Sequence, residues 1–390
     1  METNILGIWI SIFLDYVFWR DSEFCPQEGF GEECGRTKFN EIFCEMCYNK
    51  NMSKIELIKK IEVKRGSKVI TYITSDRQGP VNARVAMDII PIISEQLRKI
   101  GKTTKIDLFL YTAGGDTMVP WRLVSMIREY CDTFSVLVPY KAHSAGTMIA
   151  LGADEIVMSD LSEISPIDPS TANVFNPSDP TNPQNKIPIS VEDVIAFMSL
   201  AKDKFGIKDE VELTKIFNKF VEANPQIHPL ALGNVNRTHN LIRLIAKRLL
   251  KSHKEPMKED QIEKVVEFFT EKLYSHTYFI GRKEAKEELG VKSITDADAE
   301  LSNLMSDLYA EYAKEMELQN TVWNPENELG ANASQNIKDY KVAFVESDVL
   351  SKAFNLKIEF RRQQVMIPQQ NGIQIPQDQV AMRVVGQGWK

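Results

Sequence analysis

Apolar and polar positions in the first half of the chain fall into two alternating kinds of segment. Short and nearly continuous apolar runs are typical of strands that are covered on both faces. These runs lie at 69–74, 106–111, 134–139 and 155–158. Segments with the apolar spacing of helices separate them, at 54–64, 81–100, 117–130 and 145–151. Strands that alternate with helices predict βαβ units, and therefore an α/β fold with a parallel sheet. Pro91 is expected to kink the second of these helices.

The pattern changes twice after residue 158. Residues 162–186 are polar and rich in proline, which predicts a long loop. Helical spacing then returns, at 189–205, 211–223, 238–251, 259–274 and 297–317. From Val342 onward the sequence reads as strands, and Asn371-Gly372 predicts a hairpin turn. The parallel sheet is thus expected to be followed by a helical region and a small C-terminal β unit.

The strand predicted at 134–139 leads to Ser144, and a helix is predicted directly after that serine. A serine at such a turn stands at the edge of the sheet, and the free N–H groups of the new helix can stabilise an oxyanion. The alternative is an ordinary serine that caps the helix N-terminus. The turn Thr112-Ala-Gly-Gly-Asp116 follows the preceding strand and should lie at the same edge. Gly114-Gly115 and Ala145 can then supply two backbone donors, whereas no glycine-rich nucleotide-binding spacing is present.

A nucleophilic serine needs a base. His143 is adjacent to Ser144 and should point away from it, so we set it aside. His239 and His276 lie in the predicted helical region, where a structural role is the simpler interpretation, and His228 and His253 lie in predicted loops. The sequence assigns a carboxylate partner to none of these four histidines. A lysine can act as a base if desolvation lowers its pKa. Lys186, at the end of the proline-rich segment, is a candidate, with an ordinary surface lysine as the alternative.

The formal net charge of −7 over 390 residues does not favour a nucleic-acid partner. Basic residues at 238–251 lack interleaved aromatic residues, so we interpret them as a solvated helix face. Four of the five cysteines lie within residues 1–51, and Cys131 is the fifth. The absence of a disulfide framework in the body of the chain is expected of a cytoplasmic protein.

Residues 1–51 differ in character from the rest, and three interpretations stay open. The apolar run at 5–14 is short for a membrane span but could form a weak amphipathic anchor. Cys44 and Cys47, with Cys25 and Cys34, could bind zinc, although a second CxxC spacing is missing. The sequence from Met52 also begins like a normal protein. We assign no function to this segment and do not expect membrane contact.

Three motifs together resemble the Clp-fold serine peptidases. They are YTAGGDT at 111–117, HSAGTMIALGADEIVM at 143–158 and PIDP at 166–169. Within that group the chain is similar to the signal-peptide-peptidase A and NfeD-type branch, and most similar to the serine dehydrogenase proteinase family. The resemblance covers roughly residues 52–290, including later stretches at 228–243 and 274–285.

The resemblance implies a Clp/crotonase-like α/β fold and a serine peptidase that works through an acyl-enzyme. Ser144 matches the family nucleophile, and Gly115 and Ala145 match the oxyanion donors. A Clp-like histidine base is missing near 167–169, whereas Lys186 matches the place of the lysine in Ser-Lys peptidases. A homo-oligomer that acts on peptides or unfolded proteins, without metal or cofactor, is expected. The alternatives are a crotonase-like acyl-CoA enzyme and an inactive Clp-fold scaffold protein.

These inferences divide the chain into four parts. Residues 1–51 are an atypical extension, and 52–290 are the peptidase domain with a helical extension. Residues 291–340 form a helix and linker, and 341–390 form the β-rich C-terminal unit.

Overall fold

The computed structural model describes most of the chain after residue 51. The described residues are 52–167, 170–171, 174–179, 182, 185–187, 189–223, 228–273, 275–290, 293–320, 322–368 and 374–390. Residues Met52–Lys390 form one compact unit. The CxxC pair, the apolar run at 5–14 and the Asn371-Gly372 turn lie outside the described residues.

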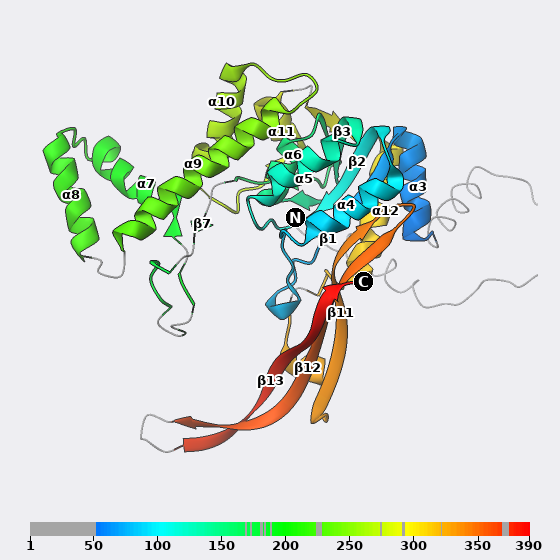
Figure 1. Cartoon of the computed structure of the whole chain (residues 1–390). Coiled ribbons are helices and arrows are strands. Elements are labelled where there is room, and N and C mark those ends of the chain that lie inside the picture. The colour runs from blue at the N-terminus through cyan, green and yellow to red at the C-terminus, as the bar shows by residue number, and fades with distance from the viewer. Residues whose placement is uncertain are drawn as a thin grey trace, which may run out of the picture. The chain divides into compact units, whose positions relative to one another are not determined.

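A single large sheet organises this unit (Figure 1). The described residues form eight strands of this sheet, in the order β10-β5-β3-β2-β1-β11-β12-β13. Strands β10 to β1 along this order pair in parallel, and the last three join by antiparallel pairs. The strand bounds are β1 Lys68–Thr74, β2 Thr103–Tyr111, β3 Cys131–Val138, β5 Glu155–Met158, β10 Ile294–Asp296, β11 Gln335–Glu346, β12 Ser351–Pro368 and β13 Gln374–Trp389. Two small sheets contain β4 Lys141–Ala142, β6 Glu163–Ile164 and β9 Ile280–Gly281, and β7 Ser170–Thr171 with β8 Ile189–Ser190.

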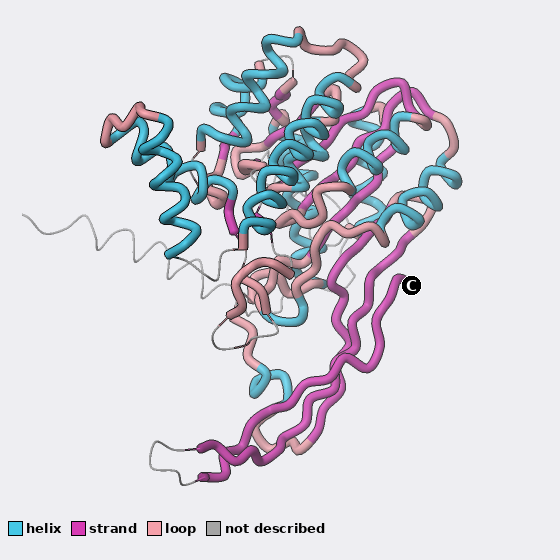
Figure 2. The backbone as a smooth tube through the Cα atoms, turned by 60° about the vertical axis from the view of Figure 1, so that its left-hand side comes forward, coloured by secondary structure: helices cyan, strands magenta, loops and turns pink. Residues whose placement is uncertain are grey.

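Helices cover both faces of the parallel strands (Figures 1 and 2). Side chains alternate between the faces with the period of two that strands impose. In β1, Ile70 and Tyr72 belong to one apolar cluster, together with residues of α4 Ile89–Ile100, α5 Val119–Arg128, α6 Ala145–Leu151, α9 Pro229–Lys251 and α10 Glu259–Glu267. Val69 and Ile73 belong to the opposite cluster, with α3 Lys54–Arg65 and α12 Ala299–Glu315. The α/β architecture with a mainly parallel sheet is confirmed.

The remaining helices lie mostly between β5 and β11 along the chain. They are α7 Val191–Ser199, α8 Glu210–Ala223, α11 Arg282–Leu289 and α13 Pro325–Leu329, with the 3₁₀ turn η1 Gly79–Val81 and the π-helical turns η2 Leu200–Lys204 and η3 Phe268–Lys272. The predicted helical region is therefore present. Helix α9 begins nine residues earlier than the spacing predicts, at Pro229, where the imidazole of His228 accepts the Leu230 N–H at 3.1 Å.

Two expectations differ from the structure for clear physical reasons. The helix expected from residue 81 begins at Ile89, so Pro91 lies in its first turn. Proline is tolerated there because the first N–H groups of a helix have no intrahelical partner, and the predicted kink is wrong. The C-terminal strands are present, but β11 pairs with β1 and extends the main sheet. Antiparallel pairing across a long sequence separation leaves no local signal in the sequence.

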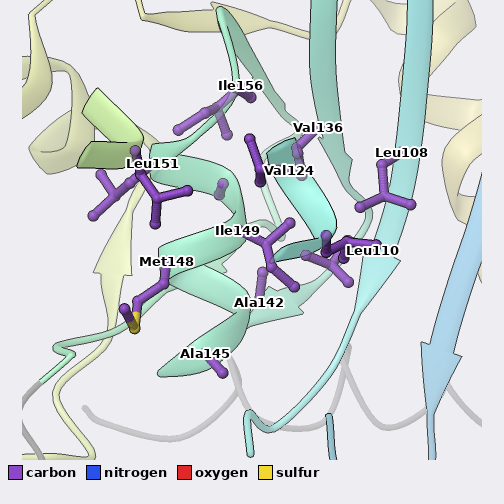
Figure 3. Packing of buried hydrophobic residues seen from close by; sticks show 14 of the residues in the cluster. Leu108, Leu110, Val124, Val136, Ala142, Ala145, Met148, Ile149, Leu151 and Ile156 are labelled. Carbon is purple, nitrogen blue, oxygen red and sulfur yellow. The ribbon is translucent and has the colours of Figure 1, made fainter. Parts of the chain in front are cut away.

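Helix α6 packs its whole length into the core (Figure 3). Met148, Ile149 and Leu151 lie among side chains of β2, β3, β5 and α5. A Cβ at Gly146 would lie 2.5 Å from Thr112 Cγ2, so glycine allows the helix to approach the end of β2. This packing fixes the N-terminus of α6 at the carboxyl edge of the parallel strands.

Candidate active site

Ser144 immediately precedes α6 and adopts a backbone conformation that is rare for a residue with a side chain. Its φ is 51° and its ψ is −110°. A positive φ in a residue other than glycine costs about 1–3 kcal/mol and persists where the surroundings impose it. The side chain makes no hydrogen bond within the described part of the chain and is partly exposed. The serine is thus held at the sheet edge in a strained turn and does not cap the helix.

The glycine turn after β2 lies directly against Ser144. A Cβ at Gly114 would lie 2.8 Å from Ser144 Cβ and 3.3 Å from Ser144 Oγ. The Gly114 N–H is already used, because it donates to Thr112 Oγ1 at 3.1 Å. The structure therefore brings the two turns together, as their predicted place at one sheet edge required.

Gly115 presents its backbone differently from Gly114. It forms a parallel bridge with Val85, in which Val85 N–H donates to Gly114 O and Asp116 N–H donates to Val85 O. In such a bridge the central residue turns its own N–H away from the partner strand. The Gly115 N–H is therefore available on the side away from Val85. A Cβ at Gly115 would lie 2.2 Å from Val85 O, so this approach needs glycine.

Ala145 is the first residue of α6 and is buried. The N–H groups of a first helical turn have no intrahelical acceptor, and the helix dipole adds positive potential there. The Ala145 N–H directly follows Ser144, as an oxyanion donor would.

His143 has a carboxylate neighbour that sequence reasoning missed. Its Nε2 lies 2.9 Å from Glu163 Oε1, because β6 pairs with β4 next to the serine turn. Burial lowers the pKa of His143, and Glu163 acts in the opposite direction. The pairing of two-residue strands is set by tertiary structure, so the sequence offered no signal for this contact.

Lys186 lies in a short hairpin. Ser178 and Lys186 form an antiparallel bridge, and Ile187 N–H donates to Pro177 O at 2.8 Å. Lys186 Nζ donates to Ser178 Oγ at 3.0 Å. The structure describes no hydrogen bond from Lys186 to Ser144. Asp168 and Pro169 of the PIDP motif lie outside the described residues.

Two other histidines are buried parts of the helical region. His253 Nε2 lies 2.7 Å from Leu151 O, and His239 Nε2 lies 3.7 Å from Glu271 Oε1. Burial lowers the pKa of both imidazoles. Across the described residues, no group of three or more His, Cys, Asp or Glu side chains could hold a metal ion.

Residues 42–220 match the family model of ClpP-like SDH-type serine proteinases. The predicted resemblance is thereby confirmed, and the match includes Gly115, Ser144 and Lys186. It begins within the N-terminal segment and ends before the stretches at 228–243 and 274–285. The match supports a serine peptidase with a Clp-like fold.

The chain is also similar to curated proteins and to solved structures. Two uncharacterised proteins of Methanocaldococcus jannaschii are 28% identical over 114 residues and 29% identical over 112 residues, which is 28% and 27% of this chain. The matches span 40% and 38% of those relatives, so the chain covers about two fifths of their length.

Solved structures that match this chain have low sequence identity and low TM-scores. A serine-to-alanine mutant of the 1510-N membrane-bound stomatin-specific protease has a TM-score of 0.31 and 15% identity, over 56% of this chain and 76% of that one. ClpP1 from Listeria monocytogenes has a TM-score of 0.31 and 14% identity, over 62% and 97%. No helix in the described ranges is both long and apolar enough to span a bilayer.

Proposed function

We propose that the protein is a serine peptidase in which Ser144 attacks the peptide carbonyl and forms an acyl-enzyme. The observation that supports this most strongly is the strained Ser144 backbone with Gly114 packed against it. A positive φ on a serine at a strand-to-helix turn lifts Oγ out of the helix and toward an approaching carbonyl. An ordinary capping serine has an extended backbone and needs no such strain.

The N–H groups of Gly115 and Ala145 would stabilise the oxyanion. Both groups come from turns at the carboxyl edge of the sheet, and neither is used by a strand or helix partner. Fixed backbone donors stabilise the developing negative charge without reorganising in the transition state. The acyl-enzyme is then hydrolysed by water, which returns Ser144 to its free form.

Lys186 is proposed as the general base. Its amine would take the Ser144 proton and pass it to the leaving amine. This role requires Lys186 Nζ to leave Ser178 and to approach Ser144 when substrate binds. We further propose that the protein works in the cytoplasm as a homo-oligomer on peptides or unfolded proteins; Cys131, a free thiol, fits the reducing compartment.

A fluorophosphonate probe tests the nucleophile directly. Wild type should be labelled on the peptide that contains Ser144, and Ser144→Ala should not be labelled. Equal labelling of the two proteins would disprove the assignment.

The base is tested by cleavage of an unfolded, fluorescently labelled protein. Lys186→Met should lower the cleavage rate by about 10²-fold or more, since general-base catalysis contributes that much. His143→Gln is the matched variant, because His143 already lies against Glu163 and should keep most of the rate. The reverse result would assign the base to His143.

A further inference from the structure

The hydroxyl of Ser165 contacts the backbone of Ser144. Ser165 lies just after β6 and is 2% exposed. Its Oγ accepts the Ser144 N–H at 2.8 Å. The same hydroxyl donates its hydrogen to Pro166 O at 3.0 Å. Because the hydrogen is used by Pro166, a lone pair of Oγ is left to face Ser144.

Ser165 is itself fixed to α6. Its N–H donates to Thr147 Oγ1 at 3.0 Å, and Thr147 Oγ1 donates to Ala142 O at 2.8 Å. Thr147 is fully buried. These bonds connect the residue before the serine turn, the first turns of α6 and the segment after β6. The Ser165 oxygen that accepts the Ser144 N–H is therefore held in place by hydrogen bonds to Pro166 and Thr147.

This contact bears on the strained conformation of Ser144. Ser144 precedes the first turn of α6 and has a φ of 51°, and at this position its N–H has no acceptor within the helix. A buried N–H without a partner costs about 1–3 kcal/mol, so the Ser165 oxygen favours this backbone conformation over an unstrained one. The direction of Ser144 Oγ depends on the same torsions.

We propose that Ser165 is a positioning residue for Ser144. It holds the peptide between His143 and Ser144 in the orientation that aims Oγ at the substrate carbonyl, and it does not touch the substrate. This inference rests on the proposed function, in which Ser144 is the nucleophile. A displacement of about 1 Å in a reacting atom can lower a rate by about 10²-fold.

The experiment measures the rate of fluorophosphonate labelling at Ser144, together with kcat and KM for a peptide substrate. Ser165→Ala should lower the labelling rate and kcat by about 10-fold to 100-fold and leave KM within about twofold. Ser165→Thr keeps the hydroxyl and should recover most of the rate. Ser165→Cys keeps the size but has a weak acceptor, and serves as the second variant if Ser165→Ala does not fold.

Ser162→Ala is the matched control for loss of a buried hydroxyl. Ser162 is also 2% exposed; its Oγ accepts the Ser159 N–H at 2.7 Å and donates to Val138 O, with no contact to Ser144. Its removal should lower stability and leave the labelling rate of the folded protein unchanged. The inference is wrong if Ser165→Ala and Ser165→Cys, when folded, label as fast as Ser162→Ala. Labelling of wild type that persists in Ser144→Ala would instead contradict the proposed function, so the two failures are distinguishable.

Discussion

Gly114 and Ser144 are packed so closely that a Cβ on the glycine would lie 2.8 Å from the Cβ of the serine. It would also lie 2.9 Å from His143 O, and Gly114 has a φ of +96°. Gly114→Ala must therefore move the nucleophile turn or the glycine turn. We expect peptidase activity to fall by about 10²-fold. Steady-state kinetics on a fluorogenic peptide measure the loss.

Gly233→Ala provides the control for this substitution. Gly233 lies in α9 and a Cβ there would meet nothing within 4 Å. Alanine in a helix interior is favoured over glycine by about 1 kcal/mol, so this variant should be slightly more stable and fully active. Full peptidase activity in Gly114→Ala would contradict this prediction, because it would show that the glycine turn and the Ser144 turn can move apart without loss of activity.

Ser144→Gly should stabilise the protein while it abolishes peptidase activity. Glycine adopts a positive φ without a steric penalty, so the strain of about 1–3 kcal/mol is relieved. The greater entropy of glycine in the unfolded chain offsets part of this gain. We expect a net gain of about 1 kcal/mol over Ser144→Ala, which keeps the Cβ and the strain. Urea unfolding of the two inactive variants makes the comparison, and equal midpoints would mean that the turn is not strained.

The sequence predicts the sheet-forming half of this protein well because the signals there are local. Continuous apolar runs mark the parallel strands, and helical spacing marks the helices α3, α5 and α6 between them. The positions of Ser144 and of the glycine turn follow from the same pattern, since strands in parallel share a carboxyl edge. The glycine turn packs directly on the serine turn at Gly114, and this contact follows from their shared position at that edge.

The contacts that the sequence does not predict all connect segments that are far apart or very short. Glu163 reaches His143 through pairing of two-residue strands, and β11 reaches β1 across most of the chain. The position of Lys186 depends on a hairpin held by Ser178, within a segment whose composition predicts only a loop. Such contacts depend on tertiary packing, so the periodicity of the sequence does not predict them.

Arg65 should contribute strongly to stability through the buried carboxylate of Asp107. Arg65 Nε lies 2.9 Å from Asp107 Oδ2, whose side chain is fully buried, and the guanidinium also pairs with Glu155. These contacts lower the pKa of Glu155 to about 2 despite its burial. Arg65→Met leaves the Asp107 charge without its partner, and we expect a loss of about 3 kcal/mol in the free energy of unfolding. Urea unfolding at pH 7 measures it.

Two further variants show whether the loss comes from the unpaired carboxylate. Adding Asp107→Asn to Arg65→Met should recover part of the stability, because the uncompensated charge is removed. Lys64→Met removes an exposed lysine that pairs with Asp298 at 2.9 Å, and stability should be unchanged within error. A loss in Lys64→Met as large as that in Arg65→Met would contradict the role of burial.

His253 should make the protein less stable as the solution becomes acidic. Burial lowers the pKa of its imidazole below the ordinary value of 6.5, with Arg128 acting in the same direction and the Leu151 carbonyl and Asp154 opposing it. The folded state therefore binds fewer protons than the unfolded state below about pH 6.5. Stability that is complete above this pH is lost as the pH falls toward the folded pKa.

His253→Gln tests this directly, because glutamine does not titrate and its amide N–H₂ can still donate to Leu151 O, which lies 2.7 Å from the imidazole Nε2. Between pH 7 and pH 5, the free energy of unfolding from urea titrations should fall less steeply in the variant than in wild type. His143 and His239 have pKa values lowered in the same sense, so some acid sensitivity remains in the variant. Parallel pH profiles for the two proteins would show that His253 has the same pKa in the folded and unfolded states, since only a difference between those pKa values makes stability depend on its protonation.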